Sequence, residues 1–108
     1  MAVNGKYYDD LETMSPPERS AYLDRKLAEH IRHTYRHAPA VKKLLDAAGV
    51  APDAIKTVKD LEKLPVTRKT DLIAMQQADL PFGGVAAIPS QDVQRVFVSP
   101  GPIYEMQP

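Results

Sequence analysis

The 108-residue sequence contains no cysteine and no tryptophan. The lack of Cys excludes a disulfide framework, a thiolate metal site and a cysteine nucleophile. No apolar run approaches the roughly 20 residues that a membrane span requires. The N-terminal residues carry acids where a signal peptide has a basic and then an apolar start. These absences predict a cytoplasmic protein with no membrane partner.

The sequence also has no excess of positive or negative charge, because its 14 Lys and Arg balance its 14 Asp and Glu. The sequence holds only five Tyr and two Phe, too few for a stacked nucleic-acid platform. We therefore expect no nucleic-acid partner. Dinucleotide, Walker, nucleophile-elbow and zinc-protease motifs are absent as well, and we expect no catalytic residue within these 108 positions.

Proline is abundant, with ten residues that separate segments of helical periodicity. Ser15, Pro16 and Glu18 form a capping-box pattern that predicts a helix over residues 16–37. Its apolar stripe runs through Leu23, Leu27, Ile31, Thr34 and Ala38, and we expect the first three of these to be buried. Asp24 lies on the same side, which predicts a structural hydrogen bond or ion pair for its carboxylate.

Pro39 and Gly49 bracket a second helix, which is expected to form a hairpin with the first and to bury Val41, Leu44 and Leu45. Thr57 and Thr67 each predict the cap of a further short helix. Gly83 and Gly84 then indicate a flexible turn.

One strand is predicted over residues 93–98, beginning at Val93 and ending at Val98, because β-branched and aromatic residues dominate there. The tail that follows reads as a loop. A lone strand leaves its main-chain groups unpaired, so we expect it to join a sheet elsewhere in its own chain and to favour a homodimer in isolation.

The expected fold class is mainly α, with four to five short helices and one C-terminal strand. Residues 1–14 form an arm whose Tyr7 and Tyr8 dock on the helices, and residues 15–92 form a helical N-terminal subdomain. Residues 93–108 contribute the strand and a truncated loop, which indicates a piece of something larger; that this is an α/β domain whose first strand they supply is implied only by the resemblance given next.

Three stretches resemble the N-terminal region of the phenylacetate-CoA ligase family of adenylate-forming enzymes. They are LETMSPPER (11–19), a run over residues 28–75 that includes DLEKLPVTRKTDL (60–72), and PFGGVAAIPSQDVQRVFVS (81–99). The resemblance implies a parent enzyme that converts a carboxylic acid, expected to be an aryl acid, into an acyl adenylate with ATP and Mg²⁺. Coenzyme A then displaces AMP. The remainder of its own chain is the implied partner, and the 108 residues themselves are expected to be structural, without a cofactor of their own.

The same resemblance suggests one cofactor-binding position. In the family the first strand opens into a Ser/Thr/Gly-rich loop that holds ATP phosphates, and Ser99 and Gly101 stand at the corresponding serine and glycine. Pro100 and Pro102 depart from the pattern because each removes a main-chain N–H donor.

Two further features are open to alternative interpretations. His30, His33 and His37 share a helix flank, with the last two spaced as metal ligands, but HTYRH lacks the acidic residue of a metalloprotease motif and we expect a solvated flank without metal. Residues 25–43 hold six Lys or Arg against one Glu. We expect a solvated or subunit-facing side, the alternative being a freestanding helical interaction module whose basic face holds an acidic partner.

Overall fold

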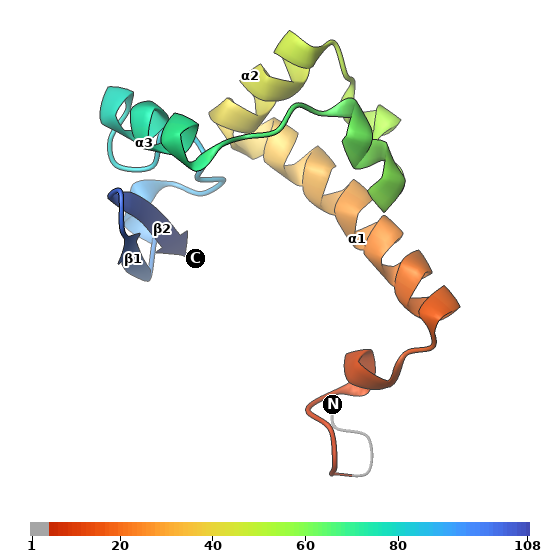
Figure 1. Ribbon diagram of the computed structural model, residues 1–108. Helices are drawn as coiled ribbons and strands as arrows, with labels where there is room; N and C mark the ends of the chain where they lie inside the picture. The colour runs from red at the N-terminus through yellow and green to blue at the C-terminus, as the bar shows by residue number, and fades with distance from the viewer. Residues whose placement is uncertain (1–4) are drawn as a thin grey trace.

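The computed structural model describes residues 5–108 and shows a mainly helical chain that ends in a β-hairpin (Figure 1). Its α-helices and strands are α1 (Pro16–His37), α2 (Pro39–Ala48), α3 (Lys69–Ala78), β1 (Arg95–Ser99) and β2 (Ile103–Gln107). Short 3-10 helices are η1 (Asp10–Thr13), η2 (Pro52–Ala54), η3 (Val58–Lys63) and η4 (Ser90–Asp92). The predicted helical fold class is thereby confirmed, as is a strand near the C-terminus.

The first helix begins at the predicted capping box. The carboxylate of Glu18 accepts from Ser15 N at 3.0 Å, and Glu18 N donates to Ser15 Oγ at 3.4 Å. The main-chain bond from Ser15 and the bond from its hydroxyl lower the pKa of Glu18. Ala38, which precedes Pro39, has an extended backbone and separates α1 from α2. Gly49 then ends α2 in the left-handed region, with φ 69°.

The helical hairpin forms a small core around Ile31, Leu45 and Ile55, and Leu27, Tyr35, Val41, Leu44, Val50 and Leu64 pack against it. The expected burial of Leu23 is wrong, since 46% of that residue is exposed. Figure 1 shows the reason: α2 lies beside the C-terminal part of α1, and the N-terminal turns of α1 extend past it.

The N-terminal arm follows its expectation only in part. Residues 1–4 lie outside the described residues. Arg19 Nη2 donates to Leu11 O at 2.8 Å, which fastens η1 to the start of α1. Tyr8 is 85% exposed, so its predicted docking on the helices is wrong. Its main-chain N–H is held instead within the arm by the carboxylate of Glu12.

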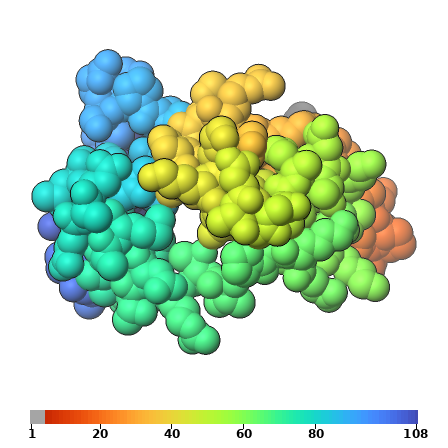
Figure 2. Space-filling model, turned by 90° about the horizontal axis from the view of Figure 1, so that it is seen from above, coloured from red at the N-terminus to blue at the C-terminus, as the bar shows by residue number. Residues whose placement is uncertain are grey.

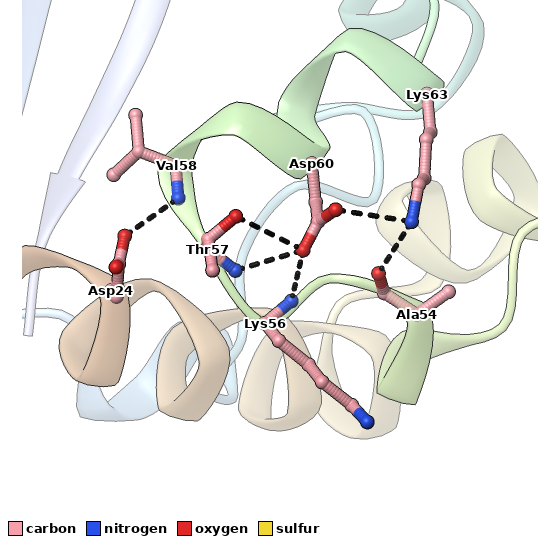
Figure 3. A network of polar contacts seen from close by, with 7 residues as sticks. All are labelled: Asp24, Ala54, Lys56, Thr57, Val58, Asp60 and Lys63. Atoms are coloured by element: carbon pink, nitrogen blue, oxygen red, sulfur yellow. Dashed lines mark hydrogen bonds and ion pairs between the residues drawn. The ribbon is translucent and has the colours of Figure 1, made fainter.

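A polar network joins η3 to α1 and η2 (Figure 3). Asp24 on α1 accepts from Val58 N at 2.8 Å, which confirms the structural role predicted for this carboxylate. Asp60 Oδ2 accepts from the main-chain N–H groups of Lys56 and Thr57, each at 2.9 Å. Lys63 Nζ lies 3.0 Å from Asp60 Oδ1. Thr57 is the N-cap, as predicted, although the helix that it begins is a 3-10 helix.

The expected cap at Thr67 is wrong by one residue. The N-cap of α3 is Arg68, whose main-chain N–H donates to Asp71 Oδ2 at 3.1 Å. The carboxylate of Asp71 in the first turn, rather than a threonine hydroxyl, accepts from a main-chain N–H at the start of the helix. The two carboxylates Asp60 and Asp71 therefore serve the same purpose at successive helix starts.

The Gly83–Gly84 turn is built into the structure and is more than the flexible link that we predicted. Gly83 has φ 66°, and a Cβ there would lie 2.9 Å from Gln76 N and from Met75 C. Gly84 O accepts from Ala40 N at 2.9 Å. The turn thus joins α3 to the start of α2, and Figure 2 shows α3, in teal to cyan, beside α2, in yellow.

The tail after β1 corrects the prediction of a C-terminal loop. Residues 103–107 form β2, which pairs with β1 in antiparallel register, with Phe97 opposite Glu105 and Val98 opposite Tyr104. The lone strand therefore has a partner within its own chain. Strand β1 also starts two residues later than expected, at Arg95, and residues 90–92 before it form η4.

The molecule is extended for its length. The radius of gyration is 16.4 Å, against about 13 Å for a compact domain of this size. Within residues 5–108 the buried hydrophobic residues are few: Ile31, Ala38, Leu45, Ile55, Phe82 and Ile103. No helix in this part of the chain is long and apolar enough to cross a bilayer. A small core in an extended molecule leaves much apolar surface uncovered.

Replacing Gly83 by Ala is expected to lower the free energy of unfolding by about 3 kcal/mol. Left-handed backbone costs an alanine about 1 kcal/mol, and the clash with α3 backbone adds about 2 kcal/mol. Gly49→Ala is the matched control, since Gly49 has φ 69° but nothing within 4 Å of a built Cβ. Urea unfolding of both variants measures the difference, and equal losses would contradict the close packing at Gly83.

The Asp60 network predicts a stability that depends on pH. The main-chain N–H of Lys56, then Lys63 and the N–H of Thr57, lower the pKa of Asp60 in the folded state. Its contribution is therefore complete above the ordinary aspartate pKa of about 3.9 and disappears as pH falls through the lower folded-state pKa. Asp60→Asn should be less stable than the parent at pH 7, and the gap should narrow below pH 4. Thermal unfolding from pH 7 to pH 2 tests this, with Asp92→Asn as control.

Candidate functional site

The candidate site is the turn that joins β1 to β2, because it holds both sequence-predicted cofactor-binding residues. Ser99 ends β1 and Gly101 lies at the turn. Ser99 Oγ donates to Ile103 O at 3.5 Å, across the turn. A Cβ on Gly101 would lie 3.1 Å from Ile73 Cδ1 of α3. The structure therefore brings the two residues together and seats the turn against α3.

Gln76 fixes the hairpin to α3, and sequence reasoning missed it. Its side chain is almost fully buried, and only 3% of the residue is exposed. Gln76 Nε2 donates to Tyr104 O at 2.9 Å, while its Oε1 accepts from Tyr104 N, also at 2.9 Å. The side-chain amide thus takes the place that a neighbouring strand's main chain would have. Gln76 is three residues after Ile73 and so lies on the same face of α3. A polar residue on this face was the one sequence signal that could have indicated a buried hydrogen bond.

This bond pair also determines which edge of the hairpin is open. Tyr104 N–H and C=O point away from β1, toward Gln76. In an antiparallel pair the opposite residue directs its own groups outward on the other side. Val98 lies opposite Tyr104, so its main-chain N–H and C=O point outward at the free edge of β1. The main-chain groups of Val96, two residues earlier, point the same way. Gln76 covers the β2 edge at Tyr104, and the β1 edge is left for another strand.

Strand β1 is apolar and exposed on both faces. Val96, Phe97 and Val98 are 51%, 52% and 62% exposed. Successive side chains point to opposite faces, so neither face of this strand is covered. A continuous apolar run is typical of a strand buried on both faces within a larger sheet. The hairpin consequently has the surface of an internal sheet element.

The turn does not by itself form a complete phosphate cradle. Pro100 and Pro102 have no main-chain N–H, and the Ser99 hydroxyl is directed to Ile103 O. Few donors are left to face an anion. The assignment of Ser99 and Gly101 to ATP stays a prediction, and no chemical step is derived from them.

The histidine cluster has the exposed setting expected of a helix flank. The rings of His33 and His37 lie 4.7 Å apart, and both residues are exposed. Across residues 5–108, no group of three His, Cys, Asp or Glu side chains is arranged to hold a metal ion. The basic stretch lies on α1 and α2, where Lys42 pairs with Asp46 at 2.6 Å.

No family model matches the chain, but its sequence is similar to those of several known enzymes. Phenylacetate-coenzyme A ligase of Thermus thermophilus is 35% identical over 95 residues, 88% of this chain and 20% of that enzyme. The Escherichia coli K12 enzyme of the same name is 36% identical over 101 residues, 94% of this chain and 22% of that enzyme. That of Aromatoleum evansii is 38% identical over 93 residues, 86% of this chain and 20% of that enzyme.

The solved structures that resemble this chain are also of a CoA ligase. A crystal structure of 2-hydroxyisobutyryl-CoA ligase with 2-HIB-AMP, in the postadenylation state, superposes with a TM-score of 0.77 at 30% identity. It covers 84% of this chain and 20% of that one. An open conformation of that ligase with 2-HIB-AMP and CoA gives 0.77 at 29% identity, over 84% and 20% of the two chains.

The fold and the hairpin thus define a class: the chain corresponds to one part of an adenylate-forming CoA ligase. Within that class it matches the N-terminal region of the phenylacetate-CoA ligase family. The chain spans about a fifth of the length of the curated relatives that it matches.

Gln76→Leu is expected to loosen the hairpin from α3. The change leaves Tyr104 N–H and C=O unpaired at a partly buried site, which costs about 2 kcal/mol of unfolding free energy. Gln77→Leu is the matched control, because the neighbouring Gln77 is exposed. Hydrogen exchange at the Tyr104 amide should accelerate in Gln76→Leu alone. Unchanged exchange there would contradict the role assigned to Gln76.

Proposed function

We propose that these residues are the N-terminal part of a phenylacetate-CoA ligase-like enzyme. The whole enzyme would form an acyl-CoA from a carboxylic acid, ATP and coenzyme A through an acyl adenylate. An aryl acid is the proposed substrate class, and a cytoplasmic location accords with the use of ATP and CoA. The observation that carries the proposal is the match of 88% of this chain to 20% of a phenylacetate-coenzyme A ligase.

The exposed strand supports the same proposal from physical chemistry. Val96, Phe97 and Val98 expose apolar surface on both faces and leave an open edge. Burial of such side chains contributes about 1.5 to 3 kcal/mol each, so a sheet supplied by the rest of the chain would stabilise the hairpin strongly. Without that sheet, the same edge would favour pairing between two copies, and a homodimer is the proposed state of the isolated chain.

The proposed role of the 108 residues is structural. Residues 15–92 would brace the large domain, and residues 93–108 would begin its sheet. Gln76 and Ile73 hold the β1–β2 turn against α3, which would direct Ser99 and Gly101 toward the nucleotide. Catalytic groups would lie in the remaining four fifths of the enzyme.

The proposed cofactors of the whole enzyme are ATP, Mg²⁺ and coenzyme A. A solved neighbour holds 2-HIB-AMP and CoA, which supports an adenylate and a thioester step in this class. Positive charge around the triphosphate is a requirement of such chemistry, and Mg²⁺ is proposed on that ground.

A chimera tests the proposed function. Replacing the matched region of the E. coli phenylacetate-coenzyme A ligase by this chain should give an enzyme that releases AMP and pyrophosphate from phenylacetate, ATP and CoA. Val96→Lys with Val98→Lys should abolish activity or folding, because two charges would enter a sheet interior.

The matched control is Val66→Lys, at a residue that is 81% exposed outside the hairpin. It should leave the activity of the chimera within about twofold, as is usual for exposed sites. A folded chimera without AMP release would contradict the proposal. Full activity of the Val96→Lys, Val98→Lys chimera would contradict the placement of β1 in a sheet.

A further inference from the structure

A second surface, formed by residues outside the β-hairpin, gathers cationic side chains around a cleft. The cleft has a volume of about 450 Å³ and is lined by Arg32, Tyr35, Arg36, Lys42, Pro52 and Asp53. It lies where α1, the start of α2 and η2 meet. This volume is within the range of small-molecule sites, about 300 to 1,000 Å³.

The two arginines share one helix face. Arg32 and Arg36 are four residues apart on α1, so their side chains are neighbours. Neither one forms an ion pair with any residue from 5 to 108: the pairs there are Lys26–Glu29, Lys42–Asp46 and Lys63–Asp60. An arginine presents five N–H donors in a planar fork, which matches the oxygens of a phosphate. Two such forks are thus available at one cleft.

Hydrogen bonds order the part of the cleft that Tyr35 and Lys42 line. Tyr35 Oη donates to Asp46 Oδ1 at 2.7 Å, and Lys42 Nζ donates to Asp46 Oδ2 at 2.6 Å. Lys42 Nζ also lies 5.3 Å from the centre of the Tyr35 ring. Asp46 raises the pKa of Lys42, which keeps the ammonium charged. These contacts hold an aromatic ring and a cation in place beside the arginines.

The charge of the cleft is positive. Asp46 neutralises Lys42, and Asp53 is the acid among the lining residues. Two arginines against one aspartate leave a net positive wall. A second, smaller cleft of about 250 Å³ shares both arginines and adds Glu29, His33 and His37. The arginines therefore stand on a ridge between two hollows.

We propose that the Arg32–Arg36 cleft binds the phosphate group of a small molecule, with Tyr35 and Pro52 contacting its less polar part. The guanidinium groups supply the charge-assisted hydrogen bonds. This site involves neither the hairpin nor Gln76, so it stands independently of the proposed ligase function.

Titration of the 108-residue chain with adenosine monophosphate and with inorganic phosphate tests this site. Calorimetry and the NMR shifts of residues 32–42 are the readouts. Both probes should bind at one saturable site, and the nucleotide should bind more tightly because Tyr35 adds a base contact. Arg32→Ala with Arg36→Ala should weaken binding at least about tenfold, the loss expected when charged hydrogen bonds are removed.

The matched control removes equal charge from the same helix. Arg25→Ala with Lys26→Ala should change affinity by less than about twofold at 0.15 M salt, where separated surface charges are screened. Equal loss in both double variants would overturn the proposal, because it would indicate diffuse attraction. Absence of saturation up to 10 mM probe would overturn it as well. Tighter binding of a polyglutamate peptide than of either probe would also overturn it and would indicate an acidic protein partner.

Discussion

The two hydrogen bonds between Gln76 and Tyr104 connect the helical part of this protein to its β-hairpin. Each is 2.9 Å long and partly buried, and together they satisfy both the main-chain donor and the main-chain acceptor of Tyr104 through one side chain. The Gly83 turn packs against the same turn of α3 and bonds through Gly84 to Ala40. Helix α3 is therefore the element through which the hairpin, the turn and α2 take their relative positions.

Short-range signals account for the parts of this fold that the sequence predicted well. The capping box at Ser15, the proline at 39 and the glycine at 49 set helix bounds that agree with α1 and α2. These signals act within one turn of backbone, so they do not depend on tertiary contacts. Asp24 was also predicted correctly, because a carboxylate on an apolar helix side requires a partner.

Long-range pairing accounts for what the sequence did not predict. Strand β2 contains Glu105 and Gln107 and follows two prolines, so its local preference for a strand is weak. It forms because β1 pairs with it on one edge and Gln76 bonds to it on the other. Likewise, Leu23 carries the correct helical spacing but is half exposed, and the N-terminal turns of α1 extend past α2 (Figure 1). Periodicity indicates which side of a helix is apolar and does not indicate how far its neighbour reaches.

The two halves of the molecule differ in how much of their apolar surface is buried. The α1–α2 hairpin and the segment that follows it together cover Ile31 and Leu45. Asp60 and Asp24 hold that segment in place through main-chain hydrogen bonds. Strand β1 has its main-chain partner but no cover on either face. A β-hairpin alone is marginally stable in water, and here it is held by one helix. The helical half thus has a core of its own, whereas the exposed faces of β1 accord with the proposed place of the hairpin in a larger sheet.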